Sequence, residues 1–161
     1  MIRFAQPADH AAIDAVTTAA FGRSDEARLT AQLRADGDAM FEMVAQDDGR
    51  IVGHIMFSRL WADRDGLYAA LAPLSVLPAL QRRGVGASLV QTGLASAPQF
   101  GAAGVLVLGE PAYYSRFGFA AETAAQVDAP YRGMPAFMGL GFVEGAFEGP
   151  MTVAYPSAFS A

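Results

Sequence analysis

Apolar and polar residues follow two different periods along this chain of 161 residues. Short apolar runs, typical of strands, alternate with segments whose apolar residues recur every three or four positions, as on one side of a helix. The runs predict strands at 2–4, 40–45, 50–60, 67–77, 104–108, 137–143 and 151–155. The helical segments open at Pro7, with Ile13, Val16, Ala20 and Phe21 on one side, and continue at 25–36, 89–94 and 112–117.

The order of these elements predicts the class of fold. The strand at 67–77, the helix after it and the strand at 104–108 form a unit that normally joins two parallel strands by a right-handed crossover. A polar loop ending in Gly49 suits an antiparallel hairpin between 40–45 and 50–60, and the last two strands are also interpreted as a hairpin. We therefore expect an α/β fold, one domain over residues 1–161, with a mixed sheet and helices on both faces.

The most informative local pattern is the run Gln81-Arg-Arg-Gly-Val-Gly-Ala-Ser88, which lies between a strand and a helix. Such a turn presents unpaired backbone amides at the positive end of the helix dipole, and its glycines remove side chains that would hold an anion away. Arg82 and Arg83 add positive charge. The run therefore predicts a phosphate or pyrophosphate site, while glycines that serve only close packing and arginines on a solvated face are the alternative. Neither G-x-G-x-x-G nor G-x-x-x-x-G-K-[ST] fits this run, which excludes those two nucleotide motifs.

Composition narrows the kind of ligand and partner. The formal net charge is −5, so the surface as a whole repels phosphate backbones, and a small anionic cofactor suits the arginine pair better than nucleic acid does. The chain has no cysteine, and its two histidines, His10 and His54, belong to no metal-binding pattern. No signal peptide or membrane span is visible. We expect a cytoplasmic protein without a metal and without a membrane partner.

Two motifs together resemble a known family. Val76-x-Pro78 followed by Gln81-Arg-Arg-Gly-Val-Gly86 resembles the strand, Q/R-x-x-G-x-G/A turn and helix of the GCN5-related N-acetyltransferase (GNAT) superfamily. The segment from Tyr114 to Phe119 resembles the Y-x-x-x-G-F segment that follows the next strand in this family. The longer string G-E-P-A-Y-Y-S-R-F-G-F is similar to a bacterial subgroup of the YhbS kind, whose acceptors are mostly unassigned. The two motifs together identify the family more specifically than either motif alone. The resemblance covers nearly the whole chain.

The resemblance implies an acyl-CoA N-acyltransferase domain with a splayed central sheet, in which acetyl-CoA is the co-substrate and a primary amine attacks the thioester directly. Pro73 is the expected place for the splay, because proline cannot donate a hydrogen bond to a neighbouring strand. The pantetheine would lie along the strand, and the backbone amides of the turn would hold the pyrophosphate. The expected coenzyme-binding residues are Leu74, Ser75, Val76, Gln81, Arg82, Arg83, Gly84, Val85, Gly86, Ala87, Ser88 and Tyr114.

The resemblance also suggests an acid but leaves the base open. Tyr114 falls where many members carry a tyrosine that protonates the departing thiolate, a task that suits a phenol; Tyr113 is the alternative. The strand before the turn has no carboxylate where some relatives place a base. Glu110 and His54 are the two candidates elsewhere. Both have ordinary structural interpretations, as a charge at the start of a helix and as a hydrogen-bonded strand histidine.

The acceptor side departs further from the family pattern. The family asparagine seven residues before the tyrosine is replaced by Val107. Asp25, Glu26, Asp36 and Asp38 either attract a cationic amine or form a solvated surface. The alternatives to an enzyme are a non-catalytic acyl-CoA-binding sensor and a general nucleotide-binding module. The acceptor, the acyl-chain preference and the oligomeric state, with a homodimer among its alternatives, stay open.

Overall fold

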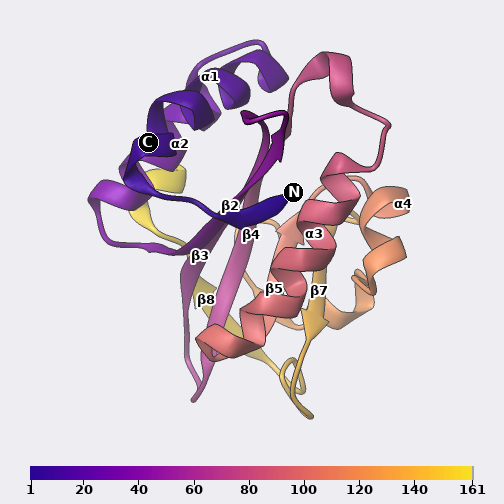
Figure 1. Cartoon of the computed structure of the whole chain (residues 1–161). Coiled ribbons are helices and arrows are strands. Elements are labelled where there is room, and N and C mark those ends of the chain that lie inside the picture. Colours follow the sequence, from indigo (N-terminus) through magenta and orange to yellow (C-terminus); the bar gives the residue numbers. More distant parts are fainter. Residues whose placement is uncertain (161) are drawn as a thin grey trace.

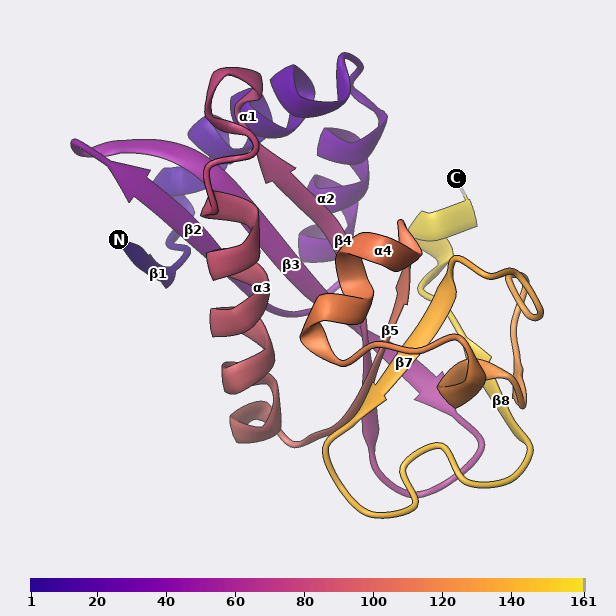
Figure 2. The ribbon, with the colours of Figure 1, turned by 90° about the vertical axis from the view of Figure 1, so that its right-hand side faces the viewer.

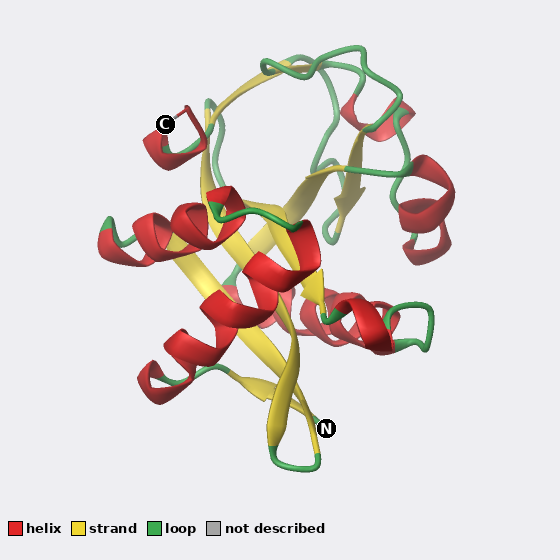
Figure 3. Cartoon of the chain, turned by 90° about the horizontal axis from the view of Figure 1, so that it is seen from above, coloured by secondary structure: helices red, strands yellow, loops and turns green. Residues whose placement is uncertain are grey.

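A mixed β-sheet forms the centre of the molecule, and helices lie on both of its faces (Figure 1; Figure 3). The computed structural model describes residues 1–160. The strands are β1 (Ile2–Phe4), β2 (Ala39–Asp47), β3 (Arg50–Ala62), β4 (Leu67–Val76), β5 (Ala102–Leu108), β6 (Val127–Asp128), β7 (Phe137–Gly141) and β8 (Met151–Ala154). The α-helices are α1 (His10–Phe21), α2 (Asp25–Ala35), α3 (Val85–Ser96) and α4 (Pro111–Tyr114), with six short 3-10 segments between or after the other elements.

The main path of the sheet runs β1-β2-β3-β4-β5-β7. Along this path β4 and β5 are parallel and all other neighbours are antiparallel. The helix α3 connects β4 to β5, as expected for a crossover between parallel strands. β8 lies off this path and pairs with the end of β3, where Trp61 opposes Ala154, and with the short strand β6.

The pairing between β4 and β5 stops halfway along β4. The last pair in register is Ala70 with Leu106, and the described chain has none beyond it. On its other side β4 continues along β3, with a register shift that places Ala72 and Pro73 in a bulge between the pairs formed by Leu71 and Leu74. Figure 2 shows the two strands together at their starts and separating toward their C-terminal ends. The sheet therefore opens where the sequence predicted an interruption.

Different helices cover the two faces of the sheet. On one face, Leu89 and Val90 of α3 pack in the main core with Ile55 of β3, and α4 contributes Tyr114 to the edge of this core. On the other face, Ile13 of α1 packs with Val44 of β2. The second part of that face is covered by α2, whose Leu33 packs with Met56 of β3. Because side chains alternate along a strand, neighbouring residues of β3 face different helices.

The structure confirms the mixed, splayed sheet with helices on both faces and the parallel pair, and it corrects three details. The last two strands do not form a hairpin: β7 pairs with β5, whereas β8 pairs with β3 and β6. Phe21 is 41% exposed rather than buried with Ile13. The helix expected at 112–117 is a single α-turn that continues as a 3-10 turn, because Gly118, at φ 99°, ends it in a left-handed conformation.

The approach of α3 to the sheet depends on Gly93. A Cβ atom at this position would lie 2.5 Å from the ring of Phe57 on β3. We expect Gly93→Val to lower the free energy of unfolding by about 2 kcal/mol, because the ring is buried and has little room to move. Urea unfolding measures this loss. Gln91→Val, on the exposed side of the same helix, should change the value by less than about 0.5 kcal/mol, and an equal loss in both variants would contradict the packing argument.

Candidate functional site

The C-terminal half of β4 offers a free strand edge. The Leu77 N–H donates to the Val52 carbonyl over 2.9 Å, so the backbone of Leu77 faces β3. The pairing is regular from there to Leu74, and in an antiparallel pair the facing residues alternate. Ser75 therefore also faces β3, whereas the N–H and C=O groups of Val76 and Leu74 face the opening between β4 and β5. The N–H groups of both residues and the C=O group of Leu74 can pair with a ligand that lies along the strand, whereas the Val76 C=O group already accepts a hydrogen bond from the Gln81 side chain.

The glycine and arginine turn connects this edge to α3. Gly84, the N-cap residue, has a φ of 88° and Arg82 has a φ of 64°, a left-handed conformation that costs a non-glycine residue about 1–2 kcal/mol. The first helical hydrogen bond runs from the Ser88 N–H to the Gly84 carbonyl, so the amides before Ser88 have no acceptor within the helix. The Gln81 side chain donates to the Val76 carbonyl over 3.0 Å and ties the turn to the end of β4.

A groove of about 590 Å³ lies between this turn, the free edge and α4. Seven of its lining residues belong to the set expected to bind the coenzyme: Leu74, Val76, Gln81, Arg82, Gly84, Gly86 and Ala87. The other two are Tyr113 and Arg116. This groove suits a long ligand that carries amides and phosphates. The strand edge can pair with the amides, and the free helix amides and the two guanidinium groups can bind the phosphates.

Sequence reasoning missed Arg116 and considered Tyr113 only as an acid. The Arg116 guanidinium lies 4.8 Å from the centre of the Tyr113 ring, and its Nε donates to the Tyr113 carbonyl over 3.3 Å. Residues three apart in a helical turn share a side, and this spacing was the available signal. The pair covers the far wall of the groove, opposite the α3 N-terminus, and a Cβ atom on Gly86 would lie 2.9 Å from the Tyr113 hydroxyl oxygen.

Some side chains of the turn point into a second cavity rather than into the groove. Arg83, Val85 and Ser88 line a different cavity, of about 620 Å³, between α3 and the strand β2, and only Gly84 lines both cavities. Ser75 is 1% exposed and lines neither cavity. The side chains of these four predicted residues are therefore separated from the groove, although the backbone amides of the turn belong to one continuous segment.

The Tyr114 ring is partly buried next to the opening of the sheet. It packs edge-on against Phe119 with ring centres 5.8 Å apart. It also lies so close to Gly109, the residue after β5, that a side chain there would collide with it. Burial, with a smaller contribution from Tyr113, raises the pKa of the Tyr114 phenol to about 12. The phenol is thus protonated at neutral pH. Phe119 is 2% exposed, as expected for a core residue.

The two candidate bases lie in different surroundings. Glu110 is exposed at the N-cap of α4, and its carbonyl accepts hydrogen bonds from the Tyr113 and Tyr114 amides. His54 on β3 is fully buried, and its Nε2 lies 2.8 Å from the Glu42 carboxylate. Burial lowers the pKa of His54, and the contact with Glu42 opposes this only in part.

Glu42 carries the charge of this buried pair. Its carboxylate accepts two hydrogen bonds from Arg34 of α2, over 2.7 and 2.9 Å, in addition to the contact with His54. Burial would raise the pKa of Glu42, but these hydrogen bonds outweigh it and hold the pKa at about 2. Sequence reasoning missed Glu42 and Arg34, because their partners are brought together only by the pairing of β2 with β3 and the packing of α2.

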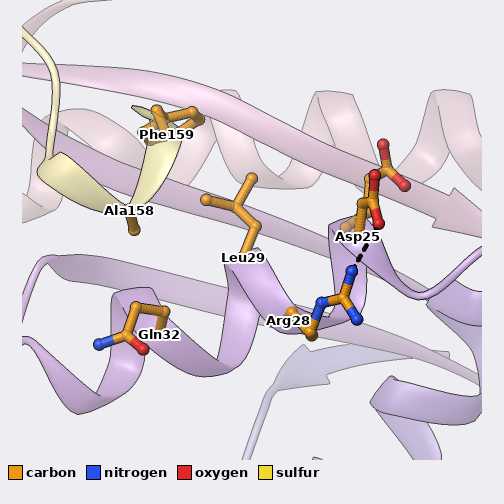
Figure 4. A pocket seen from close by; sticks show the side chains of 7 residues that line it. Asp25, Arg28, Leu29, Gln32, Ala158 and Phe159 are labelled. Carbon is orange, nitrogen blue, oxygen red and sulfur yellow. Dashed lines mark hydrogen bonds and ion pairs between the residues drawn. The ribbon is translucent and has the colours of Figure 1, made fainter. Parts of the chain in front are cut away.

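A further cavity, of about 440 Å³, lies between α2 and the C-terminal 3-10 segment (Figure 4). Its wall includes Asp25, Glu26, Leu29 and Phe159. Each carboxylate already has an arginine partner: Arg28 donates to Asp25 over 2.7 Å, and Arg23 binds Glu26 through two hydrogen bonds. Of the two interpretations of these residues, the solvated surface is favoured here over one that attracts amines, because arginines compensate the charge of both carboxylates.

Two classes of feature are absent from residues 1–160. No group of three or more His, Cys, Asp or Glu side chains is arranged to hold a metal ion. Within the same range, every helix is too short or too polar to cross a bilayer.

Comparisons with known proteins agree on one family. The model of the "Acetyltransferase (GNAT) family" matches residues 10–119. The chain is 40% identical over 130 residues to the uncharacterized N-acetyltransferase YhbS of Escherichia coli K12, covering 80% of this chain and 77% of YhbS. It is also similar to the crystal structure of Escherichia coli YhbS in complex with CoA, with a TM-score of 0.92 and 34% identity over 100% of this chain and 92% of the other. A GNAT acetyltransferase from Brucella melitensis, in complex with acetyl-CoA, gives a TM-score of 0.82 and 36% identity over 99% and 97% of the two chains.

The groove can be tested at Gly86. We expect Gly86→Val to weaken the binding of CoA at least about tenfold, because the added side chain meets the Tyr113 hydroxyl and narrows the groove. Isothermal titration calorimetry with CoA measures the change. Gln91→Val, on the exposed side of α3, is the matched control and should bind like the wild type. Unchanged affinity in a folded Gly86→Val protein would exclude this groove as the coenzyme site.

Proposed function

Because the chain belongs to the acetyltransferase (GNAT) family, we propose that it transfers an acetyl group from acetyl-CoA to a primary amine by direct attack of the amine on the thioester. The whole chain acts as one acyl-CoA N-acyltransferase domain. The observation that carries this proposal is the groove between a free strand edge, the N-terminus of α3 and the pair formed by Tyr113 and Arg116. The relatives whose structures contain CoA or acetyl-CoA support the choice of coenzyme.

The donor half of the reaction uses the edge of β4 and the turn. The amide groups of the pantetheine pair with the backbone of Leu74 and Val76, which face the opening. The pyrophosphate takes hydrogen bonds from the amides at the start of α3, where the helix dipole favours negative charge. Arg82 and Arg116 lie on two sides of the same groove and add charge-assisted contacts to the phosphates.

Tyr114 serves as the general acid. When the amine attacks, a C–N bond forms and the C–S bond breaks, so the departing sulfur needs a proton. A phenol whose pKa is about 12 keeps its proton at neutral pH and can donate it to a thiolate at close range. Its burial next to the splay also keeps bulk water away. Tyr113 lies instead in the groove, near Gly86, where it suits coenzyme binding.

The acceptor reaches the enzyme as an ammonium ion and must lose a proton before it attacks. Glu110 is the candidate that an acceptor can reach, because it is exposed at the N-cap of the helix that carries Tyr114. His54 is the alternative: its lowered pKa leaves a neutral imidazole at pH 7, but the ring is fully buried on the face that α1 covers. The acceptor itself is an amine of unassigned structure.

Binding and turnover distinguish an enzyme from an acyl-CoA sensor. We expect calorimetry to show that acetyl-CoA and CoA bind and that ATP binds far more weakly, since ATP cannot pair with the strand edge. A thiol-release assay with a panel of amines then measures transfer. If neither CoA species bound, both the enzyme and the sensor would be excluded; binding without thiol release from any amine would favour the sensor.

The acid can be tested with a pair of adjacent tyrosines. Tyr114→Phe should lower kcat by about 100-fold or more, because the thiolate then leaves without a proton, while the dissociation constant for CoA stays near the wild-type value. Tyr113→Phe is the matched variant: it should weaken CoA binding and leave kcat within a fewfold of wild type. Full activity of Tyr114→Phe would refute its role, and a larger loss of kcat in Tyr113→Phe would transfer the role to Tyr113.

A further inference from the structure

A large apolar side chain is exposed inside the sheet, at the end of β5. Leu108 is 44% exposed, although β5 has β4 as its neighbour on one side and β7 on the other. The last parallel pair joins Ala70 to Leu106, so Ala72 would oppose Leu108 if the pairing continued. Ala72 lies instead in the bulge of β4. The separation of the two strands therefore leaves Leu108 uncovered at the opening of the sheet.

The Leu108 side chain lies on the face of the sheet opposite the groove. Side chains alternate along a strand, so Leu106 and Leu108 share one face and Val107 belongs to the other. Val107 packs in the core that contains Leu89 of α3, whereas Leu106 packs in a separate core. The groove lies on the α3 side, beside the start of that helix. A molecule that contacts Leu108 therefore reaches the opening from the face away from the groove.

Aromatic rings continue the apolar surface on this face. Phe137, the partner of Leu108 on β7, lies with its ring centre 5.9 Å from that of Tyr131. The half-buried ring of Tyr155 lies 5.5 Å from Tyr131 and 5.3 Å from Phe159, between ring centres. Phe159 also lines the cavity beside α2, so there is space next to these rings (Figure 4). We call Leu108, Tyr131, Tyr155 and Phe159 the apolar wall.

The groups proposed to react lie directly beside this wall. Gly109 follows Leu108, and the Tyr114 ring lies against it. Glu110 comes next and is exposed at the N-cap of α4. Its carboxylate attracts an ammonium ion, whereas the uncharged side chains of the wall favour an apolar group. The wall and Glu110 therefore match the two ends of one kind of molecule, an amine with an apolar body.

We propose that the apolar wall binds the acceptor and selects a primary amine with an aromatic or aliphatic body, whose ammonium group lies beside Glu110. This inference rests on the proposed acetyl transfer and names the class of its acceptor. An apolar body removes the exposed part of Leu108 and the rings from water. A hydroxyl or a second charge at the same place would lose its water without gaining a partner from these side chains. Arylalkylamines and alkylamines are therefore preferred over amino alcohols and diamines.

The test compares two exposed leucines at opposite ends of β4 and β5. Leu67, which is 42% exposed, pairs with Ala102 where the two strands begin. In the wild type, kcat/KM should be at least about tenfold higher for 2-phenylethylamine than for ethanolamine. Leu108→Asn should remove most of this preference and leave the dissociation constant for CoA unchanged, while Leu67→Asn keeps the preference. Equal values for the two amines in the wild type, or an equal loss of preference in both variants, would overturn the proposal.

Binding of the amine can also be measured without turnover. In the protein saturated with CoA, 2-phenylethylamine should shift the methyl resonances of Leu108 in a carbon-13 NMR spectrum and leave those of Leu67 in place. Ethanolamine at the same concentration should shift neither. Unmoved Leu108 resonances would overturn the acceptor site. Failure of acetyl transfer itself would appear separately: 2-phenylethylamine would still shift Leu108, but no amine would release thiol from acetyl-CoA.

Discussion

The end of the β4–β5 pairing at Ala70 and Leu106 is the constraint on which the rest of this molecule depends. A parallel strand inside a sheet normally has both edges occupied and offers a ligand only its end. Here the bulge at Ala72 and Pro73 lets β4 stay with β3 while β5 follows β7. The second half of β4 therefore keeps one free edge in the middle of a well-packed domain core. The groove and the buried phenol of Tyr114 both lie at this opening.

The separation of β4 and β5 also leaves different groups on the two faces of the sheet. The face covered by α3 and α4 holds the groove with Arg82 and Arg116, which suits an anionic coenzyme, and the Tyr114 ring packs against the core on the same face. The opposite face holds the Arg34, Glu42 and His54 cluster, in which the charges are satisfied by one another. The Ser75 side chain belongs to this second face, although its neighbours Leu74 and Val76 turn their backbone groups to the opening.

The sequence was sufficient for the features that depend on neighbouring residues. The strand, turn and helix around Gly84 and Gly86 were predicted because glycine, proline and apolar periodicity act locally, and the parallel pair followed from chain order. The pairing of β8 with β3 was missed, since the short glycine-rich connection favoured a hairpin and only the packing of the complete sheet decides otherwise. Arg116 and Glu42 were missed for a related reason. Their importance comes from what lies beside them in space, which no spacing along the chain encodes.

The central claim is that the free edge of β4 binds coenzyme A through its backbone, and amide hydrogen exchange measured by NMR tests it most directly. Saturating CoA should slow exchange of the Leu74 and Val76 amides at least about tenfold, because these two face the opening. The Ser75 amide faces β3 and should change little. If CoA bound while the Leu74 and Val76 amides kept their exchange rates, or if protection were the same at all three residues, the strand edge would not be the binding surface.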